Sequence, residues 1–194
     1  MELFVQQVVA GIATGSIYAC MALALVMIYQ AIEHLNFAQG EMAMFSTFVC
    51  WQLLQWGVPY WGAFALTIVF AFAAGVFIER VVLKPLHHAP VLSHVVTFIA
   101  LYVIINSFAG FIWDFSVKPF PTPFGTAPLF GSNLIGAHQA GAIAVTVAML
   151  LFLFVFFRYT RIGLAMRAAA ANPTSAKLVG IRVGWMTALG WGMA

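Results

Sequence analysis

Long apolar runs without a charged residue constrain the fold of this chain more than any other feature. A helix of about 20 residues crosses a hydrocarbon core about 30 Å thick, so we expect each run to be a membrane-spanning helix. Five runs cover residues 8–29, 42–56, 60–78, 91–113 and 138–157. A sixth run, 183–194, would form only about 18 Å of helix, so we expect the sequence to stop inside a helix and the working protein to be longer.

The composition supports a membrane location. Of the 194 residues, 64% are hydrophobic and 7% are charged, which is too few polar residues to cover a soluble domain. We therefore predict an all-α fold, a polytopic transmembrane helical bundle in which residues 1–194 form one C-terminally truncated domain. Cys20 and Cys50 lie inside apolar runs and are interpreted as small buried hydrophobes. The basic residues do not form a cluster of the kind that would indicate nucleic acid binding.

The positions of the basic residues predict the orientation. Two of the eight Lys and Arg residues lie in the link 79–90 and five lie in the segment 158–182. Cytoplasmic loops of membrane proteins carry an excess of Lys and Arg, so both segments are predicted to be cytoplasmic. The loop 114–137 and the N-terminus would then lie outside, although the connection 33–41 would be a cytoplasmic loop without Lys or Arg.

The basic segment 158–182 contains a short helix signal. Asn172 is a favoured N-cap, Pro173 suits the first helical position and Gly180 suits the position after the helix ends. The predicted helix, 173–179, has about two turns. Such a helix in a basic loop suits docking of a cytosolic motor, with Arg167 and Lys177 nearby, but an ordinary amphipathic loop helix has the same pattern.

The polar break between the first two runs, 33–41, contains two carboxylates, a histidine and two amides. Polar groups and irregular backbone at membrane depth are tolerated where they line a cavity or have partners. If the break enters the bilayer, Asn36, Gln39, Gly40 and Glu41 are the candidates for a translocation path, with Gly40 allowing the chain to turn. The alternative is an interfacial turn with its charges in water, and the sequence favours neither.

Several smaller features have structural interpretations. Gly11, Gly15 and Ala19 are spaced four apart, which predicts a face for close helix packing. His94 and Asn106 are each expected to hydrogen-bond a neighbouring helix. The adjacent histidines 87–88 point to different faces and have no third ligand nearby, so we predict no metal site.

The outer loop 114–137 has a different chemistry from the cytoplasmic segments. Four prolines and three glycines exclude long regular structure, while aromatic residues such as Phe120 and Phe124 keep the loop apolar. We therefore expect an extended surface loop able to bind a partner.

Three motifs together resemble the LivH-type permeases of bacterial branched-chain amino acid ABC importers. They are LNFAQGE at 35–41, preceded by GSIYA, then ERVVLKPL at 79–86, and RYTRIGLAMRA continuing to LVGI at 158–181. The resemblance covers essentially the whole chain. One departure is the sequence Asn172-Pro173-Thr174, which stands where the family usually has acidic residues.

The resemblance implies a role for each segment. It implies a multi-pass permease of the inner membrane that moves leucine, isoleucine or valine by alternating access. Its partners would be a second homologous permease subunit, two cytosolic ATPase subunits and a periplasmic binding protein. The segment carrying Arg167, Asn172, Pro173, Lys177 and Gly180 would couple to an ATPase. ATP would bind to those partners, since this chain has no GxxxxGK[ST] loop and needs no cofactor of its own.

Other functions make different predictions. A permease of the same family could carry urea, short amides or other amino acids. An ion-coupled secondary transporter could relay protons through residues such as Glu33, His34 and Glu41. An intramembrane enzyme is the weakest alternative, since the sequence has neither GxSxG nor HExxH.

Overall fold

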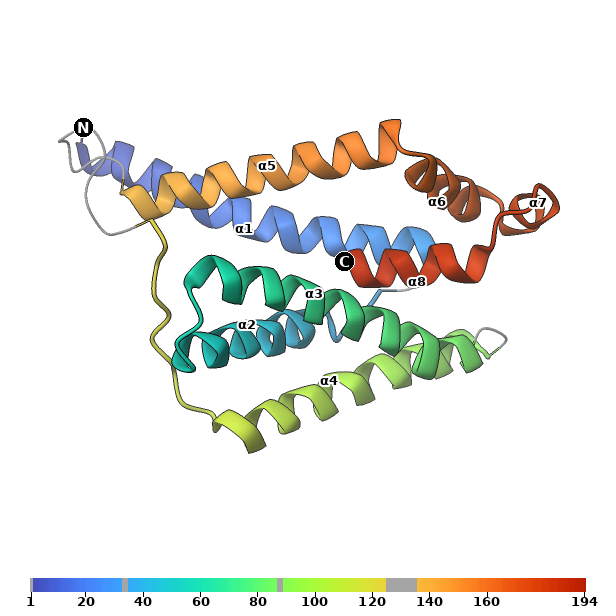
Figure 1. The fold of residues 1–194 in the computed structure, drawn as a ribbon, viewed down its shortest axis with the longest axis horizontal. Coiled ribbons are helices and arrows are strands. Elements are labelled where there is room, and N and C mark those ends of the chain that lie inside the picture. Colours follow the sequence, from blue (N-terminus) through green and yellow to red (C-terminus); the bar gives the residue numbers. More distant parts are fainter. Residues whose placement is uncertain (1, 33–34, 87–88, 125–135) are drawn as a thin grey trace.

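The computed structural model describes residues 2–32, 35–86, 89–124 and 136–194. Within these ranges the chain is helical and contains no strand, which confirms the predicted all-α class. Figure 1 shows the long helices running along the long axis of the molecule. The elements are α1 (Glu2–Ile32), α2 (Gln39–Gln55), α3 (Tyr60–Ile78), η1 (Glu79–Leu83), η2 (Lys84–Leu86), α4 (Val91–Trp113), α5 (Ala137–Tyr159), α6 (Arg161–Ala171), α7 (Pro173–Leu178) and α8 (Val183–Met193).

Four segments among the described residues are long and apolar enough to cross a membrane. They are Leu3–Tyr29, Tyr60–Leu86, Val91–Trp113 and Ala137–Tyr159. The remaining predicted span, α2, has 17 residues, which corresponds to about 25 Å of helix. The predicted count of five full spans is therefore not confirmed, because α2 is shorter than a typical hydrocarbon core.

The two ends of the bundle differ in chemistry. In Figure 1 the segments η1, α6 and α7 lie at one end, and the N-terminus and the chain that links α4 to α5 lie at the other. The first end holds the predicted cytoplasmic segments with seven of the eight Lys and Arg residues, so the charge rule predicts that this end faces the cytoplasm. This arrangement agrees with an external N-terminus.

Helix α2 does not run the full length of the bundle. In Figure 1 it occupies the part nearer the α2–α3 turn, and the chain from the end of α1 returns toward the middle of the bundle before α2 begins. Ala38, just before α2, is fully buried and belongs to a core cluster with Ile28, Phe98 and Trp191. Asn36, Ala38 and Gln39 are therefore packed inside the bundle, whereas Leu35 and Phe37 beside them are each 53% exposed.

Helix α8 packs closely on α3 because glycines remove the side chains between them. A Cβ atom added to Gly75 would overlap the backbone carbonyl of Trp191, and one added to Gly192 would lie 2.9 Å from Phe72 and Val76. Trp191 is 1% exposed and stacks on Phe98 with ring centroids 6.0 Å apart. This close approach places α8 beside the start of α2.

Candidate transport pathway and cytoplasmic face

The break between α1 and α2 is closed by the side chain of Asn36. Its Oδ1 accepts a hydrogen bond from the backbone N–H of Ala38 at 3.0 Å. Its Nδ2 donates to Oε1 of Gln39 at 3.1 Å. A short amide side chain that bonds the backbone two residues later stabilises a turn, so Asn36 makes the turn that ends the break.

Gly40 does not turn the chain, and the sequence-based explanation for it was wrong. Gly40 lies in the first turn of α2 and is absent from the described glycines with positive φ, which are Gly57 and Gly180. The turn lies earlier, at Asn36, because its amide can satisfy the backbone of that turn without a left-handed residue. Gly40 is exposed, and no neighbouring atom lies within 4 Å of a Cβ placed on it.

Gln39 lines a half-open cavity of about 420 Å³ between the helices. Residues from α1, α2, α3, α4, α5 and α8 surround this space, which we call the bundle cavity. Gln39 is 5% exposed, and its Nε2 donates to the backbone carbonyl of Ala194 at 2.9 Å. Ser46, one of the few other polar side chains on the wall, donates to the carbonyl of Met42 at 2.8 Å. The remaining wall is mainly apolar and includes Met21, Phe45, Phe70, Phe108 and Trp191.

The other predicted path residues take different positions. Asn36 is 2% exposed and does not line the bundle cavity; it hydrogen-bonds Gln39, which does. Glu41 accepts a hydrogen bond from Nδ2 of Asn106 at 3.0 Å, and this bond joins α2 to α4. The prediction of a bond to a neighbouring helix is confirmed for Asn106, whereas Nδ1 of His94 lies 3.4 Å from the carbonyl of Pro90 at the start of its own helix. Of the four predicted residues, only Gln39 contributes to the wall of the bundle cavity.

The cytoplasmic segment is more ordered than its sequence suggested, because it contains two helices. The predicted helix is α7, which ends at Leu178, one residue before the predicted end. Asn172 caps it by accepting a bond from the backbone N–H of Ser175 at 2.9 Å. Gly180 has φ +86, and the N–H of Ile181 bonds the carbonyl of Ala176 at 3.0 Å. These bonds form a C-terminal cap of the type that favours glycine.

Helix α6 was missed in the sequence. Thr160 caps it, with its hydroxyl accepting a bond from the N–H of Gly163 at 2.9 Å. The signal was present, because Thr is a good N-cap and the following residues are rich in alanine. A Cβ atom on Gly163 would overlap the carbonyl of Phe156, so this glycine lets the chain bend sharply between α5 and α6.

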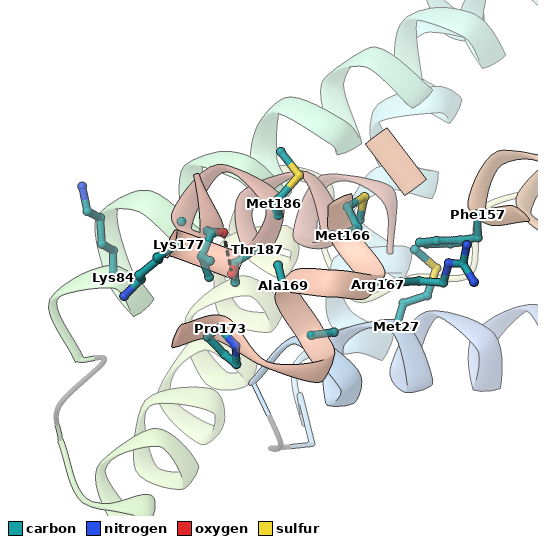
Figure 2. Close-up of a pocket in the computed structure, with 14 residues that line it drawn as sticks. Met27, Lys84, Phe157, Met166, Arg167, Ala169, Pro173, Lys177, Met186 and Thr187 are labelled. Carbon is teal, nitrogen blue, oxygen red and sulfur yellow. Dashed lines mark hydrogen bonds between the residues drawn. The ribbon is translucent and has the colours of Figure 1, made fainter. Parts of the chain in front are cut away.

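Residues from α1, α5, η2, α6, α7 and α8 line a second, half-open space of about 500 Å³, which we call the cytoplasmic pocket. Arg167, Pro173 and Lys177 line it, so the structure brings together three of the five predicted coupling residues. Lys84 from η2 also lines it and was not singled out in the sequence. Figure 2 shows Arg167 beside Met27 and Phe157, well apart from the two lysines.

An ion pair between two neighbouring residues of η1 lies beside α8. Glu79 is 1% exposed, and its Oε2 lies 3.6 Å from Nε of Arg80. The Arg80 guanidinium lies 3.9 Å from the centroid of the Trp185 ring. Glu79 begins η1, a π-helix, and such distortions are frequent at functional sites. The ERVVLKPL motif thus connects α3 to the helix that follows α7.

The described part of the outer loop is held against aromatic side chains. Nε1 of Trp51 donates to the carbonyl of Pro119 at 3.1 Å, and the ring of Phe120 packs edge-on to Tyr60 with centroids 6.4 Å apart. Val117 is 98% exposed. The part of the predicted loop at 125–135 lies outside the described residues, as do Glu33, His34 and the adjacent histidines 87–88.

The predicted packing face on α1 is open within this chain. Gly11, Gly15 and Ala19 are exposed, and a Cβ atom on either glycine would have no neighbour within 4 Å. The face that packs inward carries Ala13 and Cys20, whose thiol donates to Oγ1 of Thr146 on α5 at 3.7 Å. Whether the small residues pack against another chain remains a prediction.

These features define a class of protein. The chain is a multi-pass helical membrane protein with a cavity between its helices, an irregular segment at residues 35–38 beside that cavity, and a group of basic residues at its predicted cytoplasmic end. Irregular backbone beside a cavity at membrane depth is a feature of transport proteins. Among the described residues, no cluster of histidine, cysteine or acidic side chains could hold a metal ion.

Comparison with known proteins identifies the family. The family described as "Branched-chain amino acid transport system / permease component" matches residues 7–194, and this chain belongs to it. The permease protein LivH of Salmonella typhimurium strain LT2 is 30% identical over 200 residues, and so is LivH of Escherichia coli K12. BraD of Pseudomonas aeruginosa is 30% identical over 192 residues. All three are named as high-affinity branched-chain amino acid transport system permease proteins.

The chain corresponds to part of these relatives. The alignment covers 96% of this chain and 65% of either LivH protein, and 92% of this chain and 62% of BraD. No solved structure matches the chain. Family membership and the four apolar spans make it a multi-pass protein of the bacterial inner membrane.

Proposed function

We propose that this chain is a membrane-spanning permease subunit of an ATP-driven importer that translocates leucine, isoleucine and valine. The observation that carries the proposal is the family match over residues 7–194, combined with a bundle cavity beside the polar break. The chain acts as a transport subunit, and separate cytosolic subunits hydrolyse ATP. No bond is made or broken in the chain itself.

The bundle cavity suits an aliphatic amino acid. Its wall is largely apolar, so a branched side chain entering it would leave water for an apolar environment, which is favourable. Gln39 and Ser46 offer polar groups at the wall of the bundle cavity, and a hydrogen bond from Asn36 holds Gln39 in place. This placement supports a role for Gln39 in the path and a supporting role for Asn36.

The two faces of the chain support a complex with partners. At the cytoplasmic end, α7 is capped at both ends and carries exposed Lys177, which suits a lever that docks on an ATPase subunit. At the other end, the loop at Val117 faces a periplasmic binding protein. The open small-residue face of α1 at Gly11 and Gly15 suits a second permease subunit.

The alternatives within transport are a different cargo and a different energy source. A permease of the same family could instead carry urea or short amides, but these cargoes lack the branched apolar side chain that the largely apolar wall favours. A proton relay through Glu41 is less favoured, because that carboxylate is held by Asn106.

The test is uptake of labelled leucine by proteoliposomes that contain the purified full-length assembly. We expect uptake that requires ATP and the binding protein, and competition by isoleucine and valine but not by urea. Gln39→Leu should reduce uptake, while Thr47→Ala, on the exposed side of α2, should not. Uptake that follows an ion gradient without ATP would contradict the proposal, and so would preferential competition by urea.

A further inference from the structure

The cytoplasmic pocket combines an apolar floor with a cationic rim. Met27, Phe157, Met166 and Met186 line it from four different helices. Methionine side chains are flexible and polarizable, and they adapt to irregular apolar partners. The rim carries Lys84, Arg167 and Lys177, and no residue lining the pocket is acidic. Such a site complements a molecule with one apolar part and one anionic part.

The rim cations are available to such a molecule. Arg167 and Lys177 are exposed, and within the described residues neither forms an ion pair. In Figure 2 the floor methionines Met166 and Met186 lie between Arg167 and the two lysines. The cations therefore flank the apolar floor instead of forming one cluster on the surface.

From this geometry we infer that the cytoplasmic pocket binds an anionic phospholipid of the inner leaflet. The phosphate is held by Lys84, Arg167 or Lys177, and an acyl chain lies along the methionine floor. Basic pockets between helices on the cytoplasmic side of a membrane protein are suited to anionic headgroups. The site lies at the cytoplasmic end of the bundle, where that leaflet is found. The inference does not depend on the cargo or on ATP.

Native mass spectrometry of the purified full-length chain, titrated with phosphatidylglycerol or phosphatidylcholine, tests the inference. We expect selective retention of phosphatidylglycerol. The double variant Lys84→Gln, Arg167→Gln should weaken its binding by roughly tenfold to thirtyfold, on the basis of the attraction of a basic side chain for an anionic leaflet. The matched control is Arg158→Gln, Arg161→Gln, which removes the same charge from exposed residues of the same face outside the pocket and should retain binding.

A second variant separates the pocket from general surface charge. Gly184 lines the pocket, and a Cβ atom on it meets nothing within 4 Å, so Gly184→Leu places an apolar side chain at the pocket without changing its charge. It should reduce phosphatidylglycerol binding severalfold and leave thermal stability unchanged. Any one of three results would overturn the inference. These are equal retention of both lipids, equal losses of binding in both double variants, and binding of soluble glycerol phosphate as tight as that of the lipid. These readouts need no transport, so their failure leaves the proposed function standing.

Discussion

At the residue scale, the side chain of Asn36 organises the break between α1 and α2. It satisfies the N–H of Ala38 and also holds Gln39, which faces the bundle cavity. Both partners of Asn36 are buried. Buried polar groups cost free energy when they lose their hydrogen bonds, so the position of Gln39 depends on a residue that does not itself line the cavity.

Replacement of this side chain gives the first prediction. Asn36→Ala leaves a buried donor and acceptor without their partner, and it should lower the free energy of unfolding by about 1–3 kcal/mol. The measurement is the thermal unfolding midpoint in detergent. Thr47→Ala is the control, because the Thr47 hydroxyl is exposed and bonds only the carbonyl of Ala43 in its own helix. Equal midpoints for Asn36→Ala and the parent would show that the turn does not need this amide.

A second residue-scale prediction concerns the outer loop. Hydrogen bonds from Ser116, and then from Lys118, lower the pKa of Asp114 from its ordinary 3.8 to about 2. The lowered pKa means that the folded loop favours the carboxylate. Its contribution to stability is complete above pH 3.8 and is lost as the pH falls toward 2.

Ser116→Ala should therefore raise the pKa of Asp114 toward 3.8, and Lys118→Gln should raise it by less. The carboxyl carbon shift of Asp114 in an NMR titration reports this pKa directly. An unchanged pKa in Ser116→Ala would mean that the side-chain bond from Ser116 does not lower it, since the backbone N–H of residue 116 still donates to Oδ1 of Asp114 in this variant.

At the element scale, the caps at its two ends fix the position of α7. Of the two, Gly180 after its C-terminus restricts the residue type more than the N-cap does. Its positive φ costs about 1–2 kcal/mol for a residue with a side chain. Gly57, in the turn between α2 and α3, has a similar φ of +82 and open space around it. The two glycines therefore impose the same backbone requirement at opposite ends of the bundle.

This pair gives the third prediction. Gly180→Ala should lower the amount of leucine transported per ATP hydrolysed by roughly tenfold. The backbone strain at residue 180 costs only about 1–2 kcal/mol, but a displaced α7 would no longer transmit motion to the bundle. Gly57→Ala should carry the same local strain and keep the ratio. Both quantities are measured in the same proteoliposomes. Equal ratios in the two variants would remove α7 from coupling.

The close packing of α3 on α8 gives the fourth prediction. Gly75→Ala forces a methyl group against the backbone of Trp191, and overpacking of this kind costs about 1–3 kcal/mol. Gly11→Ala meets no atom within 4 Å and should leave the chain as stable as the parent, or slightly more stable. Thermal unfolding of the two variants side by side distinguishes them. A parent-like midpoint for Gly75→Ala would show that the two helices can separate at no cost.

Several elements could be predicted from the sequence because their signals are local. The run 91–113 matches α4, and the Asn172–Pro173 pair fixed the start of α7. Helix α6 was missed because its arginines made the segment look like a basic loop. The burial of Asn36 and Gln39 could not be predicted, because it depends on α8 reaching the start of α2 through Gly75 and Gly192, which are far away in sequence.

At the scale of the whole molecule, α8 links the bundle cavity to α7, the proposed coupling helix. This helix follows α7, contacts Arg80 through Trp185, and places Trp191 on the wall of the bundle cavity. A displacement of α7 would therefore reach the cavity through one helix. Such a connection is what the proposed ATP-driven alternating access would require of this chain.

The most direct measurement is leucine uptake by the full-length assembly before and after treatment with a small thiol reagent. The assembly carries Ser46→Cys in a background in which Cys20 and Cys50 are replaced by alanine. Ser46 lines the bundle cavity, while Val117→Cys in the same background places the label on the exposed outer loop. Labelling of Ser46→Cys should abolish ATP-driven uptake, leucine should slow the labelling, and labelling of Val117→Cys should leave uptake intact. Full uptake after complete labelling of Ser46→Cys, confirmed by mass spectrometry, would contradict a path through this cavity.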